Sequence, residues 1–113
     1  MILSGMWMSS RDVFEVKIAL GEIEKALKQC QLWSDSRPSK EALASREPFC
    51  VDTMPFEHWL QFILIPRFHA MIDSEAPLPP NLAIIPMAEE VYKAQLGLVE
   101  PLMNALTRLD AIF

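Results

Sequence analysis

The sequence predicts an all-α protein, and three observations support that prediction. Apolar residues recur at intervals of three and four positions over two long segments, which is the period of one helical face. No segment alternates apolar and polar residues in the manner of a half-buried strand. Hydrophobic residues make up 51% of the 113 residues, enough for one core without disulfides or metals. We therefore expect a four-helix bundle in a single domain, residues 1–113, with a short extra helix or turn and a proline-rich connection before the last helix.

The first predicted helix covers residues 10–33, with Ser10 as its N-cap. Its apolar stripe consists of Val13, Val16, Leu20, Ile23, Leu27 and Cys30. Charged side chains occupy the opposite positions, so we expect that face to be solvated. The N-terminus offers three candidate initiators, Met1, Met6 and Met8. Residues 1–8 are interpreted as an extended or mis-started N-terminus.

Two further helices are predicted before the proline-rich connection. A short helix, capped by its first residue, is expected over Ser39–Ala44. A longer helix begins near Pro55, with Thr53 as its N-cap, and continues to Ile72. Pro66 lies inside the longer helix, where a proline removes one backbone hydrogen bond and clashes with the carbonyl four residues back. We expect a kink at Pro66 with the helix continuing beyond it, and a full break is the alternative.

The last predicted helix follows a stiff connection at residues 73–81, which contains three prolines. It begins at Pro86, because proline suits the first helical turn, and continues to near the C-terminus. Pro101 lies inside it. We expect one bent helix there, because the residue four positions back, Gly97, has no side chain to oppose bending. The apolar stripe consists of Ala88, Tyr92, Gln95, Val99, Leu102, Leu106, Leu109 and Phe113.

The charge distribution disfavours nucleic acids and anionic membranes as direct ligands. The net charge is −5 at pH 7, and the basic residues are scattered among carboxylates. Affinity for phosphates comes instead from clustered Lys and Arg. The longest apolar run, residues 62–65, is far too short to span a bilayer. Two cysteines, Cys30 and Cys50, without a secretion signal are typical of free thiols in a reducing compartment, so we expect a cytoplasmic protein.

The sequence contains no recognisable catalytic or metal-binding pattern. The two histidines, His58 and His69, are eleven positions apart, which is about three helical turns and too far for one metal ion. Neighbouring carboxylates such as Glu89 and Glu90 do not face each other on a helix. With three glycines and no GxSxG, neither a phosphate-cradling loop nor a serine nucleophile is indicated. We predict no catalytic residues, no metal and no cofactor.

The most unusual segment is residues 47–69, which concentrates aromatic side chains between two proline-marked corners. One interpretation is a core with a packed loop. The other is a surface that docks a partner protein, because aromatic and arginine side chains dominate interface energetics. The candidate interaction surface consists of Phe49, Asp52, Phe56, Glu57, Trp59 and Arg67. Asp52 also has a structural role available, a hydrogen bond to the backbone ahead of the helix.

The same region carries a family resemblance. The block PFCVDTMPFEHWLQFILIPR at 48–67, with LP at 78–79, PMAEE at 86–90, IE at 23–24 and LW at 32–33, resembles the YqcC-like family of small bacterial proteins. The resemblance implies a helical, cytoplasmic, proteobacterial protein without established catalytic residues. In this family the gene often lies beside one for a tRNA pseudouridine synthase of the C type. This chain is too short to be that synthase and lacks its catalytic Asp motif and sheet-based domain.

Three functional hypotheses follow. The first is a non-enzymatic accessory or protein-interaction module that works with a tRNA pseudouridine synthase, because an acidic partner complements a basic RNA-binding enzyme. The second is a small-molecule-binding bundle, in which Arg67 and His69 meet an anionic group near Pro66. The third is an enzyme that uses Asp52, Glu57, Arg67 and His69, which requires at least two of them in one cleft. The broad apolar faces of the first and last helices also leave homo-oligomerisation open.

Overall fold

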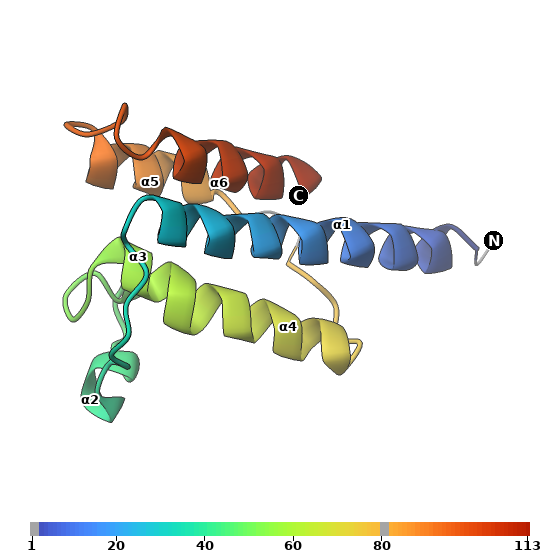
Figure 1. Cartoon of the computed structure of the whole chain (residues 1–113). Helices are drawn as coiled ribbons and strands as arrows, with labels where there is room; N and C mark the ends of the chain where they lie inside the picture. The colour runs from blue at the N-terminus through green and yellow to red at the C-terminus, as the bar shows by residue number, and fades with distance from the viewer. Residues whose placement is uncertain (1–2, 80–81) are drawn as a thin grey trace.

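The computed structural model describes residues 3–79 and 82–113, and within these ranges every regular element is a helix (Figure 1). The all-α prediction is confirmed. The helices are α1 (Leu3–Gln29), α2 (Lys40–Leu43), α3 (Phe56–Trp59), α4 (Ile65–Asp73), α5 (Ile84–Tyr92) and α6 (Glu100–Ile112). A 3₁₀ turn, η1 (Pro48–Cys50), precedes α3, and a π-helical turn, η2 (Leu60–Leu64), joins α3 to α4.

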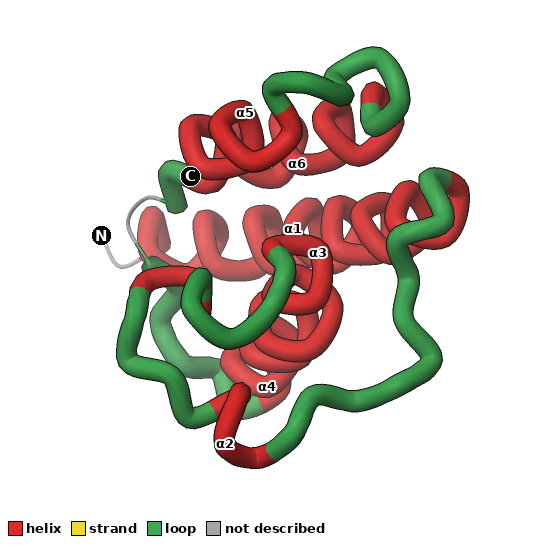
Figure 2. Tube along the Cα trace, turned by 90° about the vertical axis from the view of Figure 1, so that its left-hand side faces the viewer, coloured by secondary structure: helices red, strands yellow, loops and turns green. Residues whose placement is uncertain are grey.

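The helices form three layers, with α1 in the middle (Figure 1). On one side α1 packs along α6, which carries α5 beside it. On the other side lies a continuous helical rod made of α3, η2 and α4, which contacts α1 through α4 (Figure 2). The side chains with no exposed surface include Leu20, Ile23 and Leu27 of α1, Leu60 of the rod, and Leu102, Leu106 and Leu109 of α6.

α1 is longer at its start and shorter at its end than the sequence predicts. It begins at Leu3, so Ser10 lies inside the helix and is not its N-cap, and residues 3–8 form the first turns of the helix. Residues 1 and 2 of the predicted N-terminal extension lie outside the described ranges. The helix ends at Gln29 rather than Trp33, because Gln31 turns left-handed with φ 62°. The Leu32 N–H then donates to the carbonyl of Leu27 over 2.8 Å, which closes the helix end without a glycine.

The rod spans Pro66 without a break, as expected. Here the Ile65 N–H donates to the carbonyl of Leu60, five residues back, so the turn before the proline is wider than an α-helical turn. This widening relieves the clash between the Pro66 ring and the Phe62 carbonyl that a regular helix produces. At the start of the rod the prediction was wrong. Pro55, in extended backbone, is the N-cap, and the Thr53 hydroxyl donates instead to the carbonyl of Ala42 in α2.

The predicted single bent helix after residue 86 is two helices. α5 ends at Tyr92, residues 93–99 form turns, and α6 begins at Glu100. Pro101 therefore occupies the first turn of α6, where its missing N–H removes no helical hydrogen bond. α5 also starts earlier than predicted, at Ile84, because the Asp110 carboxylate of α6 accepts hydrogen bonds from the Ile84 and Ile85 N–H groups.

The shorter features agree better with the sequence. The Ser39 hydroxyl accepts a hydrogen bond from the Ala42 N–H over 3.1 Å, so it caps α2 as predicted.

An ion pair between Arg108 of α6 and Glu22 of α1, at 2.7 Å, lies at the exposed edge of the contact between these two helices. Of the helices described here, none is long and apolar enough to cross a bilayer.

Candidate functional site

The aromatic residues of the 47–69 segment form one cluster at the start of the rod. The Phe49 ring packs edge-on against Trp59, with ring centroids 4.8 Å apart, and edge-on against Phe56 at 5.8 Å. Phe56 and Trp59 stack nearly parallel at 5.9 Å, and Phe56 also meets Tyr92 of α5. Such pairs contribute stability beyond the apolar area that they bury. The cluster therefore fastens the loop before α3 to both the rod and α5.

The loop above this cluster bends sharply at Phe49 and Cys50. We define the corner as residues 47–52, which contain η1. Phe49 (φ 59°) and Cys50 (φ 50°) are both left-handed, although neither is a glycine. That conformation costs each residue about 1–2 kcal/mol, so contacts around the corner must offset it. The bend points the Phe49 ring onto Trp59 and leaves the Val51 side chain 57% exposed.

Hydrogen bonds hold the corner against its neighbours. The Ser45 hydroxyl donates to Oδ1 of Asp52 over 2.5 Å and accepts from the Glu47 N–H over 3.1 Å. Thr53 ties the far end of the corner to α2 through the carbonyl of Ala42, at 2.8 Å. The structural role expected for Asp52 is thus real, but its partner is the Ser45 side chain rather than the backbone ahead of the helix.

Glu57 is engaged in a second polar contact, under the aromatic cluster. The Tyr92 hydroxyl donates to Oε1 of Glu57 over 2.6 Å. Burial, reinforced by the hydrogen bond to the Glu57 carboxylate, raises the pKa of Tyr92 well above its usual range. The Tyr92 hydroxyl thus acts as a hydrogen-bond donor that joins α5 to the rod, and the raised pKa keeps it protonated to higher pH than a solvent-exposed tyrosine.

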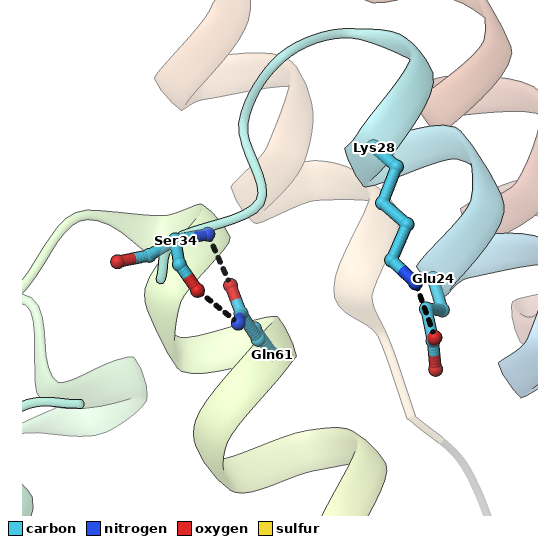
Figure 3. Close-up of polar contacts among 4 residues, drawn as sticks. All are labelled: Glu24, Lys28, Ser34 and Gln61. Atoms are coloured by element: carbon cyan, nitrogen blue, oxygen red, sulfur yellow. Dashed lines mark hydrogen bonds and ion pairs between the residues drawn. The ribbon is translucent and has the colours of Figure 1, made fainter. Parts of the chain in front are cut away.

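A third polar contact fixes the loop after α1. The Gln61 side chain is only 7% exposed, and its amide bonds to both backbone groups of Ser34 (Figure 3). Gln61 Oε1 accepts from the Ser34 N–H and Gln61 Nε2 donates to the Ser34 carbonyl, each over 2.8 Å. The nearby Lys28–Glu24 ion pair in the same view is exposed and lies within α1. Gln61 was not among the residues predicted from the sequence, although a lone amide within an apolar helical segment was a signal for it.

An open apolar cleft lies beside the aromatic cluster. Its volume is about 360 Å³, and it runs between the rod and the connection that follows α4. Six residues of the rod line it, of which four lie at intervals of four positions, and the connection contributes Pro77, Pro79 and Leu82. The four residues are Trp59, Ile63, Arg67 and Met71. Phe49 of the corner also borders the cleft, so the corner and the cleft share one aromatic wall.

The six predicted surface residues thus separate into two groups. Phe49, Trp59 and Arg67 line the cleft. Asp52 accepts a hydrogen bond from Ser45, and Glu57 accepts one from Tyr92. Phe56 is only 4% exposed, so its ring is not at the surface. These three hold the fold around the cleft and the corner.

The four groups named for an enzyme are dispersed. Asp52 lies in the corner, Glu57 beneath the aromatic cluster, Arg67 along the cleft, and His69 is exposed and outside the cleft lining. Over the described ranges no hydrogen bond or ion pair joins any two of them, and no three His, Cys, Asp or Glu residues are placed to hold a metal ion.

Comparison with known proteins identifies the family of this chain. Residues 15–112 match the DUF446 family, which is described as "tRNA pseudouridine synthase C". The chain belongs to this family. An uncharacterized protein of Haemophilus influenzae is 36% identical over 98 residues, covering 87% of this chain and 92% of the relative. The resemblance seen in the sequence is confirmed.

Two further comparisons bear on fold and function. The solution NMR structure of YqcC from E. coli superimposes with a TM-score of 0.79 at 32% identity, covering 89% of this chain and 86% of that one. A protein of Pectobacterium carotovorum named tRNA pseudouridine synthase C is 46% identical over 65 residues. That match covers 58% of this chain but only 17% of the relative, so most of the Pectobacterium protein lies outside it.

Proposed function

We propose that this chain is a non-enzymatic accessory protein that binds a tRNA pseudouridine synthase of the C type through the corner. The family description and the Pectobacterium relative support this choice of partner. In that relative the matched segment and a much longer remainder share one polypeptide. Such a link keeps two parts at high local concentration, which favours a joint function over independent ones.

The corner has the geometry of a docking element. It carries three exposed residues, the apolar Val51 and the acidic Glu47 and Asp52. Packing and hydrogen bonds hold the left-handed residues of its backbone. This exposed apolar tip on a strained, well-supported turn is the observation that carries the proposal, since such strain is concentrated at functional sites. An ordered element also loses little conformational entropy on binding.

Charge supports the same partner. The chain carries a net charge of −5, and the corner itself is acidic. An enzyme that modifies tRNA needs basic surfaces to hold phosphates. Opposite potentials accelerate association and orient the two proteins. The complex should therefore weaken as the salt concentration rises.

Binding to the purified synthase from the same genome tests this proposal. We expect the wild-type chain to co-elute with the synthase at low salt, and Val51→Asp to weaken the complex at least tenfold, about 1.4 kcal/mol or more. Leu98→Asp is the matched control, because Leu98 is 77% exposed in the 93–99 turn at a distance from the corner in sequence. Equal affinity of the Val51→Asp and Leu98→Asp variants for the synthase would show that the corner is not the docking element.

Pseudouridine formation in tRNA gives the second readout. We expect the synthase rate or its tRNA affinity to change when the wild-type chain is added, and to change less with Val51→Asp. The chain alone should form no pseudouridine. The absence of both a complex and an effect on the synthase would refute the accessory role itself.

The apolar surface of α1 bears on self-association. Phe14 and Ile18 are exposed one turn apart on α1, and Ile18 borders a shallow groove with Ala111 and Ile112 of α6. This surface suits contact with another copy, so homo-oligomerisation stays a prediction for light scattering.

A further inference from the structure

The cleft has the composition of a ligand site in its own right. We propose that it binds a small amphipathic monoanion, a molecule with one carboxylate and an apolar body. This inference goes beyond the accessory role and does not depend on the synthase. A volume of about 360 Å³ lies at the lower end of the range for small-molecule sites, roughly 300–1,000 Å³.

The walls of the cleft select an apolar body. Trp59, Ile63 and Met71 present apolar side chains on the rod on both sides of Arg67, and Pro77, Pro79 and Leu82 line the cleft from the connection. Phe49 closes the end nearest the corner. An alkyl chain or an aromatic ring placed here displaces water from apolar surface on both sides, which is the main source of affinity in such sites.

Arg67 selects the charge of the ligand. Arg67 is the one charged residue among the described residues of the lining. Within residues 3–79 and 82–113, its guanidinium forms no ion pair or hydrogen bond. A guanidinium pairs with a carboxylate through two parallel N–H···O hydrogen bonds. Arg67 lies in the middle of the stripe, four positions from Ile63 and four from Met71, so a carboxylate at Arg67 leaves apolar wall on either side.

The same lining argues against a phosphate ester or a nucleotide. A dianionic phosphate requires several donors, and among the described residues of the lining Arg67 is the one cation. The start of α5 borders the cleft at Ile84, but the Ile84 and Ile85 N–H groups already donate to the Asp110 carboxylate. The helix end therefore offers no free donors at those two positions, and a single carboxylate matches the remaining charge.

Calorimetric titration of the intact chain tests the proposal with octanoate and phenylbutyrate, each compared with the corresponding alcohol. We expect each acid to bind about tenfold more tightly than its alcohol, the contribution of one charge-assisted pair in a partly exposed site. Arg67→Leu should abolish that difference, because the acid and the alcohol then meet a wall without a cation. Arg46→Leu is the matched control, because Arg46 is also exposed but does not line the cleft.

A shift of the NMR signal of the Trp59 indole N–H on titration shows that the ligand lies in the cleft. Ile63→Trp, which fills the cleft, should prevent binding. Circular dichroism checks that this variant is folded. Three results would overturn the proposal: no binding of either acid, equal binding of acid and alcohol to the wild-type chain, or shifts that leave Trp59 unaffected. None of these results would bear on binding of the synthase at Val51, so the two proposals fail separately.

Discussion

The two sides of α1 are built in different ways. Toward α6, apolar side chains with no exposed surface pack at the helical period, and the polar contribution is the peripheral Arg108–Glu22 ion pair. Toward the rod, apolar side chains such as Leu60 are also buried, but hydrogen bonds to the Gln61 and Glu57 side chains additionally fix the surrounding loop and α5, and a cleft remains open. Periodic packing is sufficient where two helices meet along their length. Loops need specific polar partners, and the cleft that remains between the connection and the rod is available for binding.

Truncating one side chain on each side of α1 tests this contrast with the largest expected effect. Leu106→Ala removes a fully buried side chain of α6 and should lower the free energy of unfolding by about 3 kcal/mol. Met71→Ala removes a half-buried side chain that lines the cleft and should cost about 1 kcal/mol or less. Urea denaturation measures both values. Equal losses would mean that the cleft is packed as tightly as the α1–α6 side.

The Gln61 contact gives the next largest effect. Gln61→Leu keeps the side chain buried but removes two hydrogen bonds and leaves the Ser34 backbone groups without their partner, so we expect a loss of about 2 kcal/mol. Hydrogen exchange should show faster opening of residues 32–36 in this variant. Glu24→Ala, which removes the exposed ion pair with Lys28 and keeps Lys28 over the Trp33 ring, is the control and should cost less than about 0.5 kcal/mol. A similar loss in both variants would contradict the anchoring role of Gln61.

Tyr92 provides a smaller effect with a defined pH dependence. Tyr92→Phe should cost about 1 kcal/mol at neutral pH, because it removes the hydrogen bond to Glu57. The folded protein raises the pKa of Tyr92, so above about pH 10, where tyrosine in the unfolded chain ionises, only the unfolded state loses the proton. The stabilisation is therefore complete below pH 10 and declines above it. Denaturation at pH 9 and pH 11 should show a smaller decline for Tyr92→Phe than for wild type.

The sequence predicted the periodic parts of this molecule well. The stripes over 13–30 and 102–109 contained most of the residues that α1 and α6 bury, and the resemblance at 48–67 identified the family. Ser39 was recognised as a cap because its partner lies three residues away. In each case the decisive interaction is local or repeats along one helix.

The parts that were missed depend on contacts between distant residues. Asp110 sets the start of α5 from 25 and 26 positions away, and Gln61 holds Ser34 across 27 positions, so no local pattern identifies the partner in either contact. The break between α5 and α6 was also missed, because the apolar stripe passes through Gln95, which is exposed in the structure. Proline alone could not separate a bent helix from two helices.

The candidate site shows the same division. Composition drew attention to residues 47–69, but it did not separate the side chains that build the fold from those that border open space. Phe56, Glu57 and Asp52 are engaged with neighbouring residues, whereas Phe49, Trp59 and Arg67 face the cleft. The opposite wall comes from the connection after α4, which contains no residue that its sequence marks as functional.

The most direct test of the central claim is NMR mapping of the isotope-labelled chain during titration with the purified synthase. The claim is that binding belongs to the side of α1 that carries the corner, while the α1–α6 side is structural. We predict that the largest shifts or line broadening occur at residues 47–52, and that the amides of α6 change little. Changes centred on α6 with an unaffected corner would contradict the account.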